Sequence, residues 1–198
     1  MQSLNQGKTF RAPRAWLSIF FFLAAGALAF APEKVRAQAE VPKEYEIKAA
    51  FLFHFAQFVE WPSMDFTNAN DPFVIGVLGE NPFGNALDEI VKGESINGRK
   101  LAVQYSRRVD DLKDCQIVFV SKSEKSRLSR ILAELNRKNI LTVGECDGFA
   151  QLGGVMNFYL ENDTVHFEIN PDAAAREKLK ISSLLFRLGK IVTTRPKN

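Results

Sequence analysis

The segment PFVIGVLG, residues 72–79, decides the fold class of this chain. After Pro72 it is a continuous run of apolar and glycine residues, with no polar residue alternating along it. A half-buried strand alternates between apolar and polar residues, whereas a central strand of a parallel sheet is covered on both faces and does not. The segment therefore predicts a central parallel strand in an α/β fold.

Helix and strand patterns alternate beyond this segment and then give way to a hairpin. Residues 155–160 and 164–169 have period-two apolar positions on either side of a polar turn, which predicts a β-hairpin. Asn170 and Pro171 are typical of a helix start, and the apolar positions that follow predict one helix up to about residue 192. Between strand and hairpin we expect a helix at 83–92, strands at 100–105 and 116–121, a helix at 124–138 capped by Ser123, and a strand at 140–143.

The predicted fold is therefore α/β, with a mixed, largely parallel sheet, helices on both faces, a C-terminal β-hairpin and a terminal helix. Upstream of the sheet, residues 44–61 contain mostly helix formers and stop before Pro62, which predicts a helix of about four turns. Apolar side chains surround this helix, and Lys48, Gln57 and Glu60 are its polar markers. Such a helix is expected to be buried on two sides.

The N-terminus has the layout of a secretory signal peptide. Lys8, Arg11 and Arg14 precede an apolar run at 15–31, which is shorter than the roughly 20 residues of a membrane-spanning helix. The small residues Ala37 and Ala39 fit a signal peptidase, so we predict a signal peptide at 1–39 and a mature domain at 40–198. An uncleaved N-terminal anchor is the alternative, and it leaves the domain on the same side of the membrane.

Removing the predicted signal changes the charge of the protein. Residues 1–39 hold five of the 26 Lys and Arg and one of the 23 Asp and Glu, which leaves 21 basic and 22 acidic residues and a net charge of −1. This balance gives no basic field for nucleic-acid binding. The remaining 159 residues are enough for one domain with its own core.

Cys115 and Cys146 are the only cysteines, and export to an oxidising compartment suggests a disulfide. However, Cys115 precedes one predicted strand and Cys146 follows another, which places them at opposite ends of a parallel pair. Five strand residues span about 16 Å, beyond the roughly 7 Å limit on the Cα separation of a disulfide. We therefore expect two free thiols.

The two histidines offer little for catalysis. His54 lies in the apolar N-terminal helix and is expected to be a core residue. His166 and Glu168 share one face of a strand, which fits either two ligands of a metal or a solvated sheet face. No cofactor and no metal site is predicted, and the chain has no set of residues that would make it an enzyme.

A weak candidate for ligand binding is the loop that follows the central strand. Gly79, Glu80, Asn81 and Gly84 join this strand to a helix start, where α/β sheets commonly bind anions. The loop lacks the Lys-Ser or Lys-Thr of a Walker motif, and Glu80 places a negative charge where a phosphate would lie. A turn that only begins the helix is the other interpretation.

The most informative feature is the apolar surface of the first and last helices. Part of it is expected to form an interface, although both helices could also pack entirely against each other and the sheet.

Five motifs together cover the mature domain in order: IKAAFLFHFAQFVEWP (47–62), VLGENPFG (77–84), GGVMNF (153–158), FEIN (167–170) and LKISSLL (179–185). In these motifs the chain resembles the YfiR-like family of periplasmic regulators. It implies a negative regulator that binds the periplasmic domain of an inner-membrane diguanylate cyclase, lowers cyclic di-GMP output and disfavours biofilm formation. It also implies a homodimer and release by an outer-membrane lipoprotein. The resemblance further implies two disulfides, for which the two cysteines of this chain are too few.

We therefore expect a periplasmic protein-binding regulator whose partner is such a cyclase or a sensor kinase. A periplasmic small-molecule sensor is the alternative function. The residues predicted to bind the partner are Phe51, Phe53, Phe55, Phe58 and Trp61 of the first helix and Lys180, Ser183, Phe186 and Arg187 of the last.

Overall fold

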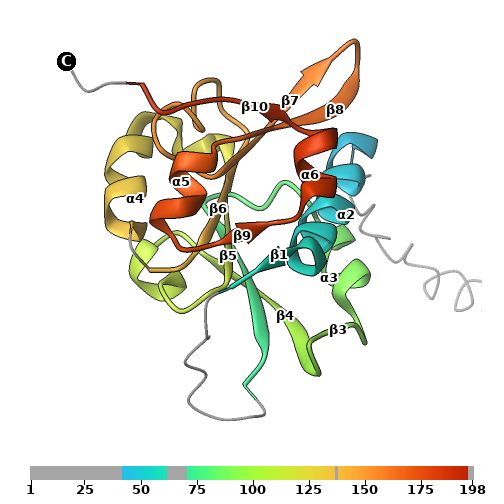
Figure 1. Cartoon of the computed structure of the whole chain (residues 1–198). Helices are drawn as coiled ribbons and strands as arrows, with labels where there is room; N and C mark the ends of the chain where they lie inside the picture. Colours follow the sequence, from blue (N-terminus) through green and yellow to red (C-terminus); the bar gives the residue numbers. More distant parts are fainter. Residues whose placement is uncertain (1–41, 62–70, 137, 196–198) are drawn as a thin grey trace, which may run out of the picture. The chain divides into compact units, whose positions relative to one another are not determined.

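The computed structural model describes residues 42–61, 71–136 and 138–195. Residues 39–198 form one compact unit (Figure 1), and the signal peptide predicted at 1–39 lies outside the described residues. The described helices are α2 (Lys43–Phe58), α3 (Ala86–Val91), α4 (Leu128–Leu135), α5 (Pro171–Arg176) and α6 (Ser183–Leu188), with the 3-10 helices η1 (Val109–Leu112) and η2 (Lys122–Arg127).

The described strands form an eight-stranded sheet in the order β10-β8-β7-β6-β5-β2-β4-β3 and a separate antiparallel pair, β1 with β9. Their bounds are β1 (Val59–Glu60), β2 (Phe73–Leu78), β3 (Ser95–Ile96), β4 (Arg99–Ser106), β5 (Ile117–Val120), β6 (Leu141–Gly144), β7 (Met156–Glu161), β8 (Thr164–Ile169), β9 (Lys180–Ile181) and β10 (Lys190–Ile191).

The large sheet is mostly parallel, as expected from the segment at 72–79. β2 lies between β4 and β5 and is parallel to both, and the parallel order continues through β6 to β7. Antiparallel pairing occurs only where β3 joins β4 and where β7 joins β8 in the described sheet. Because the chain crosses from β4 over β2 to β5, the strand order changes direction at the carboxyl end of β2, where α/β sheets commonly bind ligands.

Helices cover both faces of the sheet, which confirms the predicted fold class (Figure 1). Strand β5 shows why: Ile117 and Phe119 pack on the face that carries α2, α3, α5 and α6, whereas Val118 and Val120 pack on the face that carries η1 and α4. All four residues are fully buried, which is why the segment reads as a continuous apolar run rather than an alternating one.

The predicted hairpin is present as β7 and β8. Residues Asn162 and Asp163 connect the two strands, and both have positive φ, at 49° and 58°. Two consecutive residues of positive φ form a type I′ turn, whose backbone twist matches the twist of the two strands that it joins. Asn and Asp tolerate this backbone region better than other non-glycine residues.

The single helix predicted from Asn170 to about residue 192 is wrong. Asn170 does cap a helix, accepting a hydrogen bond from the Ala173 amide at 3.0 Å, but α5 ends after six residues. The chain turns at Lys178, where φ is 55°, and then forms β9, α6 and β10. Helix α6 ends at Gly189, whose backbone is extended, with φ −98° and ψ 155°. Gly189 also lies so close to Phe167 that a Cβ there would be 2.5 Å from its ring.

The other three helix predictions differ from the structure in their bounds, and the helix predicted at 83–92 is the shorter α3. The first helix ends at Phe58 rather than residue 61, because Val59 and Glu60 pair with β9 as a strand. The helix predicted at 124–138 consists of η2 followed by the shorter α4, and Ser121 rather than Ser123 is its cap. The Ser121 hydroxyl accepts a hydrogen bond from the Ser123 amide at 3.4 Å.

Candidate interaction surface

Helix α2 has two different longitudinal faces, although its composition is apolar almost throughout. Ala49, Leu52, Phe55 and Ala56 are buried against the sheet at a spacing typical of one helix face. The opposite face carries Ile47, Phe51, His54 and Phe58, of which Phe51 is half-buried and the others are exposed. Thus α2 is buried on one side and presents apolar and aromatic side chains on the other.

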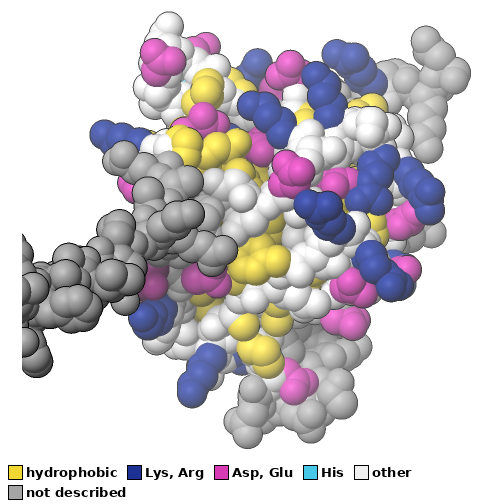
Figure 2. Space-filling model, turned by 180° about the vertical axis from the view of Figure 1, so that it is seen from behind, with side chains coloured by type: hydrophobic (Ala, Val, Ile, Leu, Met, Phe, Trp, Pro, Cys, Tyr) yellow, Lys and Arg dark blue, Asp and Glu magenta, His cyan; other side chains and the backbone are white. Residues whose placement is uncertain are grey.

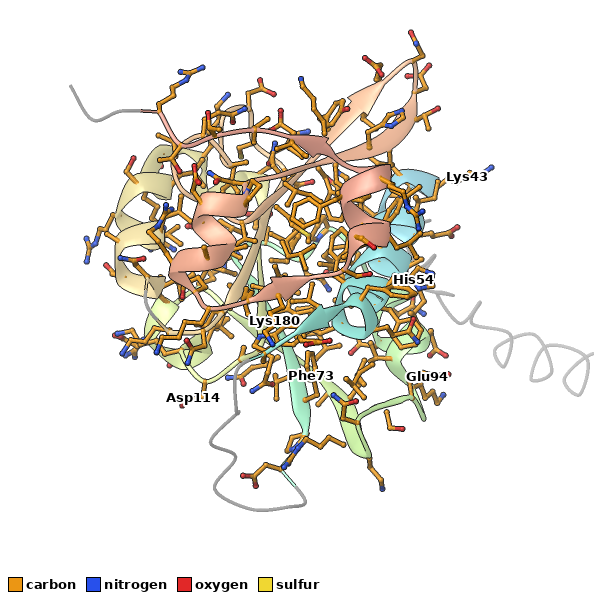
Figure 3. All side chains as sticks on the ribbon, in the orientation of Figure 1. Lys43, His54, Phe73, Glu94, Asp114 and Lys180 are labelled. Carbon is orange, nitrogen blue, oxygen red and sulfur yellow. The ribbon has the colours of Figure 1, made fainter. Side chains whose placement is uncertain are left out.

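His54 is not the core residue that the sequence predicts. It lies on the outer side of α2, as Figure 3 shows, and its Nδ1 atom is 3.1 Å from Oε1 of Gln57. The rings of Phe53 and Phe58 lie on either side of it, at 5.8 and 6.3 Å between centroids. The prediction failed because apolar residues surround α2 in sequence, so composition alone did not show which side the sheet would cover.

Lys48 is the second residue of α2 whose environment differs from the prediction. The sequence marks it as a polar, outward position, yet it is only 2% exposed. Its Nζ atom lies 2.8 Å from Oε2 of Glu145, and the two side chains are 3% and 1% exposed. Lys48 also pairs with Glu44 one turn earlier and lies 4.5 Å from the centroid of the Tyr45 ring.

This buried ion pair connects α2 to the carboxyl end of the parallel sheet. Glu145 directly follows β6, and its other carboxylate oxygen accepts a hydrogen bond from the Lys122 amide after β5, at 3.0 Å. Burial raises the pKa of the Tyr45 phenol above its usual range, and the negative charge of Glu145 adds to the rise. Because a buried charge must remain paired, the contact fixes the rotation of α2 and therefore which face points outward.

Helix α6 lies beside α2 (Figure 1) and continues the exposed apolar face. The two segments are joined where the Ser182 amide donates to the Phe58 carbonyl oxygen at 3.0 Å, next to the pairing of β1 with β9. The ring of Phe167 links them as well, since it lies 5.4 Å from the Phe51 ring and closely under Gly189. Leu185 of α6 is buried, whereas Leu184 and Leu188 are exposed, the latter by 60%.

We define the α2–α6 surface as Ile47, Phe51, Phe58, Leu184 and Leu188. Chain segments more than a hundred residues apart in sequence meet in it. Exposed apolar side chains that gather on one side of a soluble domain are typical of a protein interface. The arrangement can bind another protein, and it holds no set of groups for bond-making chemistry.

The residues predicted to bind a partner lie in three different environments. Phe58, Lys180, Ser183 and Arg187 are exposed, and Figure 3 shows Lys180 beside β1 and β9. Phe51, Phe53, Trp61 and Phe186 are half-buried, whereas Phe55 is fully buried between the Phe158 and Phe167 rings. Of these residues, Phe51 and Phe58 face outward beside Ile47, Phe55 lies in the core, and Trp61 packs against Phe73 with its indole N–H donating to the Gln116 carbonyl oxygen at 3.2 Å. Partner binding by all nine residues stays a prediction.

Sequence reasoning missed Ile47, Leu184 and Leu188. Ile47 could have been found, because positions 47, 51, 54 and 58 follow one helix face. The two leucines could not be assigned to an outer face while residues 170–192 were treated as one helix. The short helix α6 begins instead after Ser182, whose hydroxyl accepts from the Leu184 amide at 3.3 Å.

The loop proposed as a weak ligand site uses its polar groups internally. Asn81 donates to the Gly84 carbonyl oxygen at 2.8 Å and accepts from the Phe83 amide at 2.9 Å. The Glu80 amide donates to the hydroxyl of Ser123 at 3.0 Å, and the same hydroxyl lies where a Cβ at Gly79 would be. Ligand binding by Gly79, Glu80, Asn81 and Gly84 remains a prediction.

The candidates for metal and thiol chemistry are engaged in packing. Within the described ranges, no group of three or more His, Cys, Asp or Glu side chains could hold a metal ion. His166 stacks on Tyr159 with 5.5 Å between ring centroids, and Glu168 lies 3.9 Å from Lys190. Cys115 and Cys146 are free and buried, and burial raises the pKa of the Cys115 thiol to about 12.

Among the residues that the structure describes, no helix is both long enough and apolar enough to cross a bilayer.

Two solved structures resemble parts of this chain. A conserved domain protein from Vibrio cholerae O1 biovar El Tor strain N16961 is 11% identical with a TM-score of 0.48, and the match covers 76% of this chain and 60% of that one. The ABC domain of a Streptococcus pneumonia protein, in complex with L-Trp, is 9% identical with a TM-score of 0.44, covering 60% and 55% respectively. The chain thus spans less than two thirds of the length of either. No curated protein matches the sequence.

The family comparison covers most of the domain. The family model described as YfiR/HmsC-like matches residues 45–190, which run from the first turn of α2 through α6 to the first residue of β10. The family consists of periplasmic regulators that act through a partner protein rather than by catalysis. The chain belongs to the YfiR/HmsC-like family.

Proposed function

We propose that this protein is an exported negative regulator that binds the periplasmic domain of an inner-membrane diguanylate cyclase. Binding holds the cyclase inactive and lowers the output of cyclic di-GMP, which disfavours biofilm formation. Membership of the YfiR/HmsC-like family supports this role.

The observation that carries the proposal is the α2–α6 surface. Its apolar residues come from both ends of the domain, and Leu188 remains 60% exposed even though the domain has a large core elsewhere. Burying apolar side chains of this size against a partner would contribute about 1.5–3 kcal/mol each. The surface is bordered by the exposed charges of Lys180 and Arg187, which suits the apolar centre and polar rim of protein interfaces.

The proposed mechanism is occupancy. A regulator that binds only the inactive conformation of the cyclase shifts the population toward that conformation, and removal of the regulator lets it return. The buried pair of Lys48 with Glu145 supports this mechanism, because it keeps the apolar face of α2 in one orientation before the partner arrives. A homodimer and an outer-membrane lipoprotein that removes the regulator belong to the same proposal.

The test is crosslinking in cells with an epitope-tagged, exported protein, followed by identification of the captured membrane proteins. We expect capture of an inner-membrane protein with a cytoplasmic cyclase domain. Capture of a sensor kinase would retain the binding mechanism and overturn the cyclase as partner. Self-crosslinks alone would overturn both.

A matched pair of variants assigns the surface. Leu188→Asp should abolish capture and raise cyclic di-GMP, because it places a charge within the α2–α6 surface. Leu152→Asp is the control: Leu152 is also an exposed leucine, 50% exposed, but lies outside that surface. If both variants lost capture equally, this location of the interface would be overturned. The same would follow if both variants remained folded and neither lost capture.

A further inference from the structure

The opposite face of the sheet carries a second surface feature, and it is charged. A shallow open pocket of about 190 Å³ lies between the chain that follows β4, the end of η2 and helix α4. Four arginines line it, together with two acidic and two apolar residues: Arg107, Arg108, Arg127 and Arg130, Asp110 and Glu134, and Val109 and Ile131. Figure 2 shows Lys and Arg side chains gathered over the side of the molecule that carries α4, with Asp and Glu between them.

Sheet topology brings these arginines together. Arg107 and Arg108 directly follow β4, and Arg127 ends the 3-10 helix that follows β5. Because β4 and β5 are the two parallel neighbours of β2, their carboxyl ends lie on either side of the point where the strand order changes direction. The Arg127 guanidinium donates to the Arg107 carbonyl oxygen at 2.9 Å, which holds the two sides of the pocket together.

The arginines retain free hydrogen-bonding capacity. Arg107 approaches Glu80 and Arg108 approaches Asp111 only to 3.9 Å, which is too long for a hydrogen bond, and both arginines are more than two thirds exposed. A guanidinium carries five N–H donors in a planar fork. The forks of Arg107 and Arg108 are therefore open to an incoming acceptor.

The charge of the lining favours an anion. Arg130 is paired with Glu134 at 2.7 Å, Arg127 with Glu124, and Asp110 with Lys113. The charge available to an anion is therefore that of Arg107 and Arg108, whose nearest acids lie 3.9 Å away. The lower part of the pocket is apolar, since Val109 and Ile131 are buried in the core below it.

We propose that this pocket binds a phosphate group. Two open arginine forks suit a tetrahedral phosphate, whose several oxygens can each accept from a different fork, better than a carboxylate with two oxygens. The volume is below the roughly 300–1,000 Å³ of sites for drug-sized ligands, so it accommodates a phosphate with a small alcohol rather than a dinucleotide. Glycerol phosphate, free or as an anionic lipid headgroup, has this chemistry. The proposal does not rest on the protein being a repressor.

The test measures binding of inorganic phosphate and glycerol 1-phosphate by calorimetry, and of phosphatidylglycerol vesicles by flotation, to protein purified after export. The double variant Arg107→Gln with Arg108→Gln should weaken binding about tenfold or more, because charge-assisted hydrogen bonds are lost. The control, Lys92→Gln with Lys100→Gln, removes the same charge from exposed positions outside the pocket and should change binding less than twofold. Thermal melts establish that both variants are folded.

Two outcomes support the proposal and distinguish the source of the phosphate. Saturable binding of glycerol 1-phosphate that is lost only in the arginine variant identifies a soluble ligand. Binding only to phosphatidylglycerol vesicles, again lost only in the arginine variant, identifies a lipid surface. Equal weakening in both double variants would show a non-specific charge effect and overturn the site, as would absence of binding to all three probes.

Discussion

The two faces of the sheet are similar inside and different outside. Both bury apolar strand residues under helices, as the alternation of Ile117 and Val118 along β5 shows. The outer side of α2 and α6 presents apolar side chains, whereas the outer side of η1 and α4 presents arginines and acids. The two halves of the core thus follow one pattern of burial, while the two exteriors, for which we propose a protein interface and a phosphate site, differ in chemistry.

The faces also differ in how they use ion pairs. Lys48 and Glu145 are both almost fully buried beneath the α2 face, whereas Arg130 and Glu134 pair on the exposed side of α4 at 2.7 Å, with Arg130 82% exposed. The following predictions test whether this contrast in burial controls stability.

The largest expected effect is that of Glu145→Ala. It should lower the free energy of unfolding by about 3–5 kcal/mol, because it leaves the buried ammonium of Lys48 without its main partner. The matched variant Glu134→Ala should cost less than about 1 kcal/mol, because water and salt screen its exposed partner. Urea denaturation measures both.

The double variant Lys48→Met with Glu145→Leu controls for the burial itself. It removes both charges and should recover most of the stability lost in Glu145→Ala, since an apolar pair of similar volume can replace a buried ion pair. Comparable losses in Glu145→Ala and Glu134→Ala would contradict the contrast between the two faces.

The next effect separates core from surface within α2. Phe55→Ala should cost about 3–5 kcal/mol, because the ring is fully buried against Phe158 and Phe167. Phe58→Ala, three residues later on the exposed face, should cost less than about 1 kcal/mol while weakening partner capture. If Phe58→Ala unfolded the protein as readily as Phe55→Ala, the exposed face would be structural rather than free for a partner.

The smallest expected effect concerns the thiols beneath the α4 face. The pKa of Cys115 rises from 9.0 to about 12 on burial, and burial also raises the pKa of Cys146. Both thiols should therefore remain almost unlabelled by iodoacetamide in the native protein near neutral pH and react readily in urea, as followed by mass spectrometry.

The same thiol gives a signed pH dependence. Because the folded state keeps the Cys115 proton to a higher pH than the unfolded state, this contribution to stability is complete below about pH 9 and is lost between about pH 9 and 12. Cys115→Ala should flatten the fall in stability over that range. An unchanged slope would show that other groups cause it.

Much of the fold could be predicted because its signals are local. The apolar run at 72–79 predicted the central strand, Asn170 predicted a helix cap, and Asn162 with Asp163 predicted the turn of the hairpin. Each signal depends on neighbours within a few residues, so no knowledge of distant contacts was needed.

The errors lie where distant contacts override local preference. Residues 170–192 have helical spacing, but β9 pairs with β1 from the other end of the domain, and Gly189 must pass close to Phe167. His54, which was expected in the core, is exposed, and Lys48, a polar marker in the sequence, is buried against Glu145, because tertiary packing decides which side of α2 faces the sheet.

The sequence by itself determined the fold class and the family, since these follow from periodicity and from motifs of contiguous residues. Only the tertiary structure decided the two surfaces. Phe58 and Ser182 meet beside the pairing of β1 with β9, and Arg107 meets Arg127 because β4 and β5 flank β2. The physical reason is that strand pairing joins residues far apart in the chain, and no pattern within either segment encodes its partner.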